Sequence, residues 1–336
     1  MSYIYNHITK EHNVAYQEIK EFLEQNNLLM DCNVTDFIEV RDKSMLVACA
    51  GLDGNIIKCV AINENNRGSG ISLSMLSEVQ KLAISQGYSE LFLFTKPCNV
   101  ELFKAAGFYP IIIHDQVVLM ENSQNRFAKF CHHLTQYQKI DGVSGAIVMN
   151  ANPFTLGHQY LIQKALENCD WLHVFVVQEN LSFFSFEDRY QLVQEGTKQF
   201  DRVTVHKGSD YIISRASFPN YFLKDTNLVS SSHAGLDLSI FRKFIAPALN
   251  ISCRFVGTEP TDMITRQYNG EMVHYLQETQ DESLTINVIE IPRISITENV
   301  ISASSVRRYL ADQNFDAIAQ LVPDSTLKYL VERYKK

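Results

Sequence analysis

The feature that most restricts the fold is a regular alternation of short apolar strands and helices through the second half of the chain. The predicted strands cover residues 145–149, 172–177, 202–206, 253–257 and 285–291, and the predicted helices cover 158–168, 186–198 and 303–311. Strands that are separated by helices form parallel sheets with helices on both faces. The sequence therefore predicts a doubly wound, Rossmann-like α/β domain, whose ligand site lies beyond the carboxyl ends of the strands.

The first half shows another order of elements. A helical start over residues 1–30 precedes several strands, and the remaining expected elements are strands over 34–40, 45–50, 56–62, 91–94, 111–113 and 117–120 and helices over 71–85 and 100–106. A chain of 336 residues is long enough for two domains. We expect an α+β domain over residues 1–120, a polar linker helix over 121–142 and the α/β domain over 143–336.

Composition and charge argue against several classes of function. The net charge is −8 with dispersed basic residues, which argues against a nucleic-acid partner. No apolar run reaches the roughly 18–20 residues of a membrane span, and no signal peptide is visible at the N-terminus. The seven scattered cysteines are typical of a reduced cytoplasmic protein. Any anion site must then be local, built from a few residues and helix starts.

One such helix start is Thr155-Leu156-Gly157-His158, which follows the strand ending at Met149. A glycine beside a histidine at a strand-to-helix turn exposes backbone N–H groups and an imidazole at the positive end of a helix. The alternative interpretation is a glycine-containing turn with an incidental histidine. The preceding strand, Asn152-Pro153 at the turn and the amphipathic helix that follows favour a site that holds a phosphate chain.

A second helix start lies in the run Ile301-Ser302-Ala303-Ser304-Ser305-Val306-Arg307. Ser302 can cap the helix, Ser304 and Ser305 add hydroxyl donors, and Arg307 can form paired hydrogen bonds with phosphate oxygens. Alone, this pattern also fits an ordinary capped helix with an exposed arginine. Together, the two motifs predict nucleotidyl transfer.

The two motifs resemble those of the HxGH nucleotidyltransferase superfamily, in the branch where threonine replaces the first histidine. The resemblance implies that His158, Thr155 and Arg307 are catalytic, with the imidazole at the α-phosphate of ATP and the serine and arginine motif on the leaving pyrophosphate. The residues that we expect to contact ATP are Asn150, Asn152, Phe154, Thr155, Gly157, His158, Gly257, Glu259, Ile301, Ser302, Ser304, Ser305 and Arg307.

Some candidates remain open. Glu259 could bind ribose hydroxyls or could simply be a turn carboxylate. Relatives in this superfamily often place a phosphate-binding lysine in the loop that corresponds to residues 178–184, which here contains no lysine or arginine. Arg189, Arg215 and Lys224 are the alternatives for that charge. We also expect Ser214 and Arg215 near the reaction centre.

In the first half, Arg67-Gly68-Ser69-Gly70 resembles the pyrophosphate-binding turn of the GNAT acetyltransferase fold, and the segment 102–108 resembles a later element of that fold. Two residues depart from the pattern. Asn65 stands where the turn usually begins with glutamine or arginine, and Phe103 stands where many members have a tyrosine that acts as general acid. The resemblance therefore implies binding of a CoA-like arm by Arg67, Gly68, Ser69 and Gly70 rather than acetyltransferase chemistry.

Both halves together resemble the citrate (pro-3S)-lyase ligase family over essentially the whole chain. The resemblance implies an AMP-forming acid–thiol ligase that uses ATP and Mg²⁺. Acetate would form acetyl-adenylate, and its acetyl group would then pass to a thiol on the acyl-carrier subunit of citrate lyase, which bears a dephospho-CoA-type prosthetic group. Mg²⁺ would be carried by ATP. Cys131-His132-His133 is better interpreted as a solvated helix face than as a metal site.

Three alternatives accompany this interpretation. The first is the sister ligase that activates malonate decarboxylase. The second is an adenylyltransferase acting on phosphopantetheine or a pyridine mononucleotide, against which the polar stretch 209–224 and the fused first half count. The third is an acyl-CoA N-acyltransferase, which Phe103 disfavours.

Overall fold

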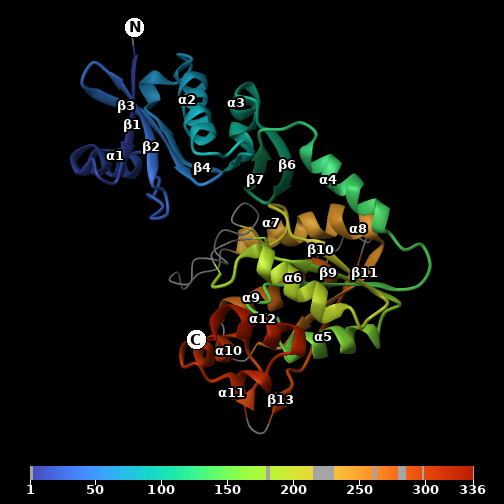
Figure 1. Cartoon of the computed structure of the whole chain (residues 1–336). Helices are drawn as coiled ribbons and strands as arrows, with labels where there is room; N and C mark the ends of the chain where they lie inside the picture. The colour runs from blue at the N-terminus through green and yellow to red at the C-terminus, as the bar shows by residue number, and fades with distance from the viewer. Residues whose placement is uncertain are drawn as a thin grey trace. The chain divides into compact units, whose positions relative to one another are not determined.

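The computed structural model describes residues 3–178, 182–214, 231–259, 263–278, 285–296 and 299–335. By packing, the chain divides into two compact units, residues 1–127 and 128–336, which are treated separately below (Figure 1). The three-part division into 1–120, 121–142 and 143–336 stays a prediction. None of the helices in the described ranges is long and apolar enough to cross a bilayer.

The N-terminal unit is built on a mixed β-sheet. Its strands are β1 (Tyr3–Thr9), β2 (Asp36–Asp42), β3 (Met45–Asp53), β4 (Ile56–Ile62), β5 (Phe92–Thr95), β6 (Tyr109–His114) and β7 (Val117–Glu121). Over residues 3–127 the strand order is β1-β2-β3-β4-β5-β7-β6, and β4–β5 is the parallel pair. The α+β class expected for this part of the chain is confirmed.

Helices cover both faces of this sheet. They are α1 (Asn13–Gln25), α2 (Ile71–Ser85) and α3 (Val100–Ala105), with short turns η1 (Glu64–Asn66) and η2 (Pro97–Asn99). Leu23 of α1 packs in one core cluster with Phe37, whereas Val79 of α2 packs in another with Ile38. Because neighbouring strand residues point to opposite faces, α1 and α2 lie on opposite sides of the sheet.

The helical start expected over residues 1–30 is wrong in its first third. Tyr3–Thr9 form strand β1, which pairs antiparallel with β2, and helix α1 begins only at Asn13. Tyrosine, isoleucine and threonine favour strands, and the available edge of β2 decides the outcome.

The C-terminal unit contains the predicted parallel sheet. Its strands are β8 (Ser144–Met149), β9 (Trp171–Val176), β10 (Val203–Lys207), β11 (Ile251–Gly257) and β12 (Asn287–Ile291). Among the described residues, the order is β10-β9-β8-β11-β12, and every adjacent pair is parallel. The doubly wound fold is confirmed. The order reverses between β8 and β11, where such folds form a ligand crevice.

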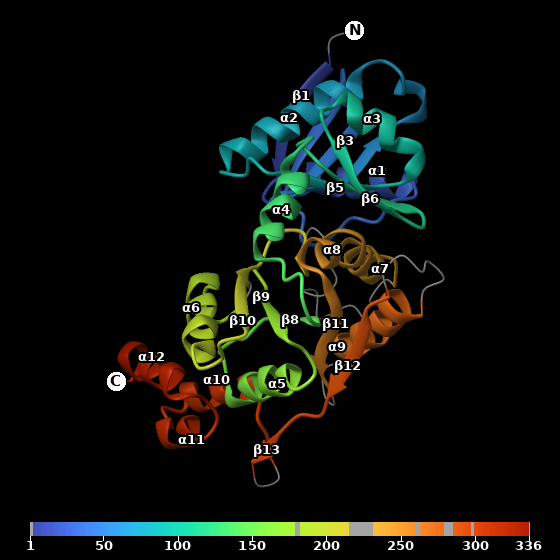
Figure 2. The ribbon, with the colours of Figure 1, turned by 90° about the vertical axis from the view of Figure 1, so that its right-hand side faces the viewer.

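Helices α5 and α6 lie on one face of this sheet, and α7 to α9 lie on the other (Figure 2). The helices and turns are α4 (Arg126–Leu134), η3 (Thr135–Tyr137), α5 (Leu156–Leu166), α6 (Phe186–Thr197), α7 (Ser231–Ile240), η5 (Phe241–Ile245), α8 (Ala246–Leu249), α9 (Met263–Met272), η6 (Val273–Gln277), α10 (Ala303–Ala311), α11 (Phe315–Ala319) and α12 (Asp324–Tyr334). A ribbon of β13 (Ser295–Ile296) and β14 (Asn299–Val300) precedes α10.

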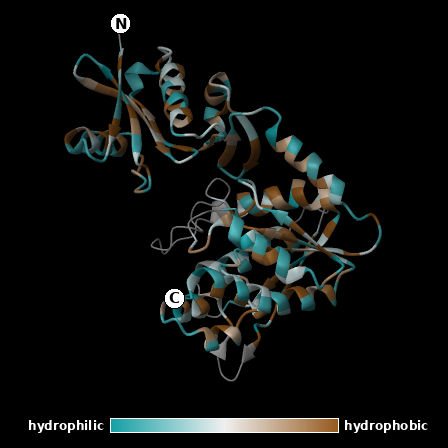
Figure 3. Cartoon of the chain, in the orientation of Figure 1, coloured by the Kyte–Doolittle hydropathy of each residue, from teal (hydrophilic) through white to brown (hydrophobic). Residues whose placement is uncertain are grey.

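Apolar packing holds the helices to the sheet and to each other. Ile162 of α5 and Leu192 of α6 share a core cluster with Phe255 of β11. A separate cluster, which includes Ile301, Val306 and Leu330, joins α10 to α12. Figure 3 shows polar and apolar residues interleaved along the helices, as expected for elements that cover a core with one face.

Candidate active site

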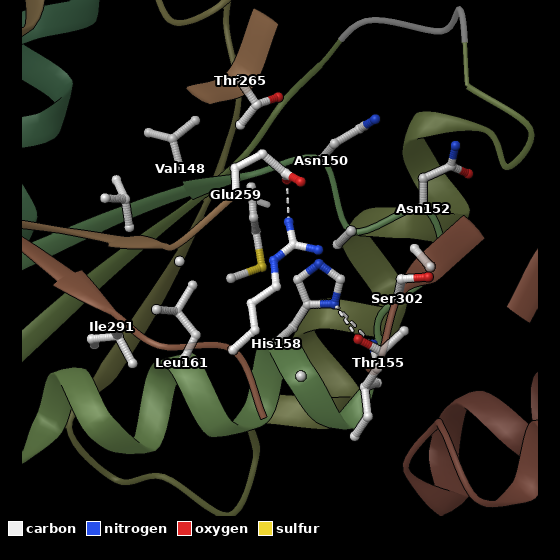
Figure 4. A pocket seen from close by; sticks show the side chains of 18 of the residues that line it. Val148, Asn150, Asn152, Thr155, His158, Leu161, Glu259, Thr265, Ile291 and Ser302 are labelled. Atoms are coloured by element: carbon white, nitrogen blue, oxygen red, sulfur yellow. Dashed lines mark hydrogen bonds and ion pairs between the residues drawn. The ribbon is translucent and has the colours of Figure 1, made fainter. Parts of the chain in front are cut away.

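A cavity of about 690 Å³ opens at the carboxyl ends of β8, β11 and β12 (Figure 4). Its walls come from the turn after β8, the first turns of α5 and α10, and helix α9. Of the expected ATP-contacting residues, those that line it are Asn150, Asn152, Thr155, Gly157, His158, Gly257, Glu259, Ile301, Ser302, Ser304 and Arg307. The cavity therefore lies at the switch point of the sheet and brings both predicted motifs together.

The imidazole of His158 is oriented by the residue that begins its own helix. Its Nδ1 accepts a hydrogen bond from the backbone N–H of Thr155 at 3.0 Å and lies 2.8 Å from Thr155 Oγ1. An acceptor nitrogen carries no proton, so the ring hydrogen of the neutral side chain is assigned to Nε2. Figure 4 shows both side chains at the start of the helix. His158 can therefore offer an N–H donor to a ligand.

Burial, followed by the charge of Arg293, lowers the pKa of His158 to about 4. The imidazole is therefore neutral at pH 7, in contrast to an exposed histidine, whose pKa lies near 6.5. The ring of Phe154 stacks on it at 5.5 Å between centroids. Phe154 itself is fully buried and is not among the residues that line the cavity, so its side chain supports the imidazole from the core side. Its contact with ATP stays a prediction.

The second motif forms the first turn of α10. Ser302 caps the helix, accepting a hydrogen bond from the N–H of Ser305 at 3.1 Å, and its hydroxyl lies 2.9 Å from that of Ser305. Ser305 is not among the residues that line the cavity, and its contact with ATP stays a prediction. Arg307 donates to the carbonyl of Asn152 and, at 3.0 Å, to Ser304 Oγ.

Gly157 lies where the two motifs meet. A Cβ at this position would lie 3.4 Å from the carbonyl oxygen of Ile301 and 3.4 Å from Thr155 Oγ1. The neighbouring N–H of Leu156 donates to the carbonyl of Leu321 at 2.9 Å. The start of α5 is thus fixed directly against the C-terminal helices.

Glu259 lies at the end of β11, and its carboxylate forms an ion pair with Arg293. Arg293 also donates through Nε to the carbonyl of Thr258 at 2.8 Å. Arg293 was not among the residues predicted from the sequence. Its signal was a basic residue two positions after the apolar strand β12, at the edge where ligands bind.

Arg189, one of the three alternatives for the phosphate-binding charge, is directed toward backbone carbonyls, and its contact with phosphate stays a prediction. The side chain is completely buried and donates to the carbonyls of Asn150, Val177 and Phe184, with the first two at 2.9 and 2.7 Å through Nη1. It also holds Asn150 Oδ1 at 2.9 Å. Arg189 therefore fixes the turn after β8 through these buried hydrogen bonds.

The remaining predicted residues lie elsewhere. Ser214 is buried, donates to the carbonyl of Asp210 and does not line the cavity, although its neighbour Ile213 does. Arg215 and Lys224 lie outside the described residues. In the described ranges, no group of three or more His, Cys, Asp or Glu side chains is arranged to hold a metal ion.

In the N-terminal unit, Arg67 to Gly70 form the turn before α2. Gly68 and Gly70 have φ values of +80° and +79°, and a Cβ at either position would meet nothing within 4 Å. Ser69 Oγ donates to the carbonyl of Asn66 at 2.7 Å. The turn is therefore open to a ligand, and its two glycines adopt left-handed backbone conformations just before a helix of 15 residues.

The two strands next to this turn diverge. β4 and β5 pair only through Ile56 with Phe92 and Ile57 with Leu93, although β4 continues to Ile62. Phe103 is 4% exposed and belongs to the core under α2. A phenylalanine in that position has no proton to donate.

Similar proteins agree with this architecture. A family model described as the citrate lyase ligase C-terminal domain matches residues 144–330. A citrate (pro-3S)-lyase ligase of Klebsiella pneumoniae is 46% identical over 94% of this chain and 92% of its own. The ligases of the same name from Haemophilus influenzae and Escherichia coli K12 are 48% identical (93% of this chain, 94% of the relative) and 44% identical (97% and 93%).

Solved structures resemble a smaller part. Escherichia coli ElaA covers 36% of this chain and 100% of its own, with a TM-score of 0.30 and 15% identity. A PaiA N-acetyltransferase from Thermoplasma acidophilum, in complex with coenzyme A, covers 37% and 99%, with a TM-score of 0.29 and 14% identity. On the identity and coverage of the ligases, the chain belongs to the citrate (pro-3S)-lyase ligase family of enzymes.

Proposed function

We propose that the protein activates acetate with ATP and transfers the acetyl group to a thiol on the acyl-carrier subunit of citrate lyase. A carboxylate oxygen of acetate attacks the α-phosphorus, the bond to the β-phosphate breaks, and acetyl-adenylate and pyrophosphate form. The thiol of the dephospho-CoA-type prosthetic group then loses its proton and attacks the acetyl carbonyl, giving the thioester and AMP. We expect Mg²⁺ to enter with ATP and neutralise the triphosphate, and we expect the reaction to take place in the cytoplasm.

One observation carries this proposal: His158 and the first turn of α10 line the same cavity. Acetate is already ionised at neutral pH, so its attack needs no general base. A neutral imidazole with its hydrogen on Nε2 can donate to an α-phosphate oxygen as negative charge builds up there. Catalysis would then consist of positioning and electrostatic stabilisation.

The leaving pyrophosphate has its own candidate site. The first N–H groups of a helix have no partner within the helix, and in α10 they begin next to Ser304 and Arg307. Arg307 is held in place by the carbonyl of Asn152, which preorganises its guanidinium. Glu259 remains our candidate for binding the ribose hydroxyls. Its carboxylate would bind them while it stays paired with Arg293.

The deciding experiment is pyrophosphate release from ATP by the purified protein. Release that depends on acetate, followed by acetylation of the citrate lyase carrier subunit, supports the proposal. Release only with phosphopantetheine or a pyridine mononucleotide would make the protein an adenylyltransferase. Acetylation of the malonate decarboxylase carrier in place of the citrate lyase carrier would favour the sister ligase.

For the N-terminal unit, we propose that Arg67, Gly68, Ser69 and Gly70 bind the prosthetic arm through its pyrophosphate. Gly68→Ala and Gly70→Ala should raise the KM for the carrier protein and leave acetate-dependent pyrophosphate release unchanged. Gly87→Ala is the matched control, because Gly87 also has a positive φ (+91°) and open space but lies at the other end of α2. Equal carrier kinetics in all three variants would contradict this role.

A further inference from the structure

Arg254 is a buried charge in the middle of the parallel sheet. It lies on β11, one of the two strands at the switch point, and is 2% exposed. Its neighbour Phe255 packs toward α5 and α6, so strand alternation directs Arg254 to the opposite face, where its guanidinium lies 4.4 Å from the ring centre of Phe241. Arg254 also lines the cavity.

Two nitrogens of the Arg254 guanidinium, Nε and Nη1, have no hydrogen-bond acceptor among the described residues, and both are sealed from solvent. An arginine carries its charge at any physiological pH, and a buried charge without partners is costly. Buried polar groups with no partner call for an explanation, and a missing ligand is one.

The nearby carboxylate is engaged by other groups. Asp237 Oδ1 accepts from the backbone N–H of Ile213 at 2.7 Å, and Oδ2 accepts from the hydroxyl of Tyr268 at 2.6 Å. Asp237 therefore contributes negative charge near Arg254. Burial lowers the pKa of Arg254, and the attraction of Tyr268 and Asp237 acts against that effect.

The walls around Arg254 are mostly apolar. The cavity-lining residues on this side are Val148, Val256, Ile213 and Met272, together with Tyr268 and Asn269. Val256 lies two positions after Arg254 on β11 and shares its face. An anion held here would have a positive charge at one end and hydrocarbon around the rest.

We propose that Arg254 binds the carboxylate of the acyl substrate, and that the apolar walls select a short monocarboxylate such as acetate. This inference rests on the proposed function, because it assigns the acid that is activated. A carboxylate in the cavity would place a negative charge beside this buried guanidinium, and an ion pair in a site with little water is stronger than one in solvent.

The test compares Arg254→Met with the wild type. We expect the KM for acetate in pyrophosphate release to rise roughly 30- to 100-fold, as for the loss of a charged hydrogen-bond pair, while the KM for ATP stays within about twofold. Methionine removes the buried charge, so thermal stability should be equal or higher. Arg254→Lys, which keeps the charge, should recover part of the acetate affinity.

Arg202→Met is the control, because Arg202 donates to the carbonyls of Cys169 and Asp170 and does not line the cavity. It should leave the acetate KM unchanged. A folded Arg254→Met variant with wild-type acetate KM would overturn the inference and leave the proposed function standing.

Direct binding separates the two ideas. Line broadening of ¹³C-acetate by the wild type, but not by Arg254→Met, supports the carboxylate site. If the same wild-type protein releases no pyrophosphate with acetate, the proposed function fails and the carboxylate site stands. Equal broadening by both proteins contradicts the site. Inorganic phosphate serves as a second probe, and displacement of acetate by phosphate at equal concentration would show a general anion site and overturn selection of a monocarboxylate.

Discussion

The exchange of His158 for glutamate would keep an acceptor for the N–H of Thr155 and would remove the N–H donor that we propose for the α-phosphate. His158 is the third residue of α5 and accepts a hydrogen bond from the N–H of Thr155, which begins the helix. Glutamate is a common acceptor in this position of a capping box, and a carboxylate is favoured at a helix start by about 0.3–1 kcal/mol. The variant should therefore fold with nearly wild-type stability at pH 7.

Its activity should be lost for two reasons. Removal of one preorganised donor typically lowers kcat about 10²- to 10³-fold. A carboxylate facing the α-phosphate adds repulsion of about 4 kcal/mol for unit charges ~4 Å apart at an effective dielectric constant near 20. We therefore expect His158→Ala to lose about 10²- to 10³-fold and His158→Glu to lose at least ~10-fold more.

The assay is acetate-dependent pyrophosphate release at saturating ATP and acetate, with urea unfolding as the check on folding. The order of activity, wild type above His158→Ala above His158→Glu, is the discriminating result. If the glutamate variant were as active as the alanine variant, the imidazole would not face the triphosphate, and the proposed role of His158 would be refuted.

Four further predictions follow from the same geometry. The pKa of His158 is lowered to about 4 in the folded protein, so between pH 6.5 and 4 the unfolded chain binds a proton that the folded protein does not. This group therefore destabilises the wild type as the pH falls, by about 2 kcal/mol at pH 5. Urea unfolding at that pH should show that His158→Ala has gained stability relative to the wild type. Arg307→Ala should reduce kcat about 10²-fold or more with little change in acetate KM, measured by pyrophosphate release. Gly196→Ala should cost about 1–3 kcal/mol in urea unfolding, because its Cβ would overlap the ring of Phe154. Arg189→Met should cost about 3 kcal/mol or more in the same assay, since it leaves buried carbonyls without donors.

Much of the fold could be predicted from local patterns. The strands of the parallel sheet are short apolar runs between amphipathic helices, so their order along the chain indicates the fold class. Helix α7 is different, because residues 234–240 are all buried and no polar face marks a helical period. The prediction of a helix for Tyr3–Thr9 was wrong for another reason, because the pairing of this segment with β2 decides its conformation.

The residues of the candidate site also divide into those with a local sequence pattern and those without one. Thr155, Gly157 and His158, and likewise Ser302 and Arg307, are recognisable because each motif is contiguous in the sequence. Arg293 has only a weak local signal, a basic residue two positions after β12, and Arg254 has none, because their significance depends on β11 and β12 lying side by side in the sheet.

The hydrogen bond from the N–H of Leu156 to the carbonyl of Leu321 joins two segments that are far apart in the sequence. The turn that orients the imidazole of His158 is therefore completed only when α10 to α12 are docked against α5. Local opening of these three helices would release the start of α5. Such an opening would disorder the cavity wall before the parallel sheet itself unfolds.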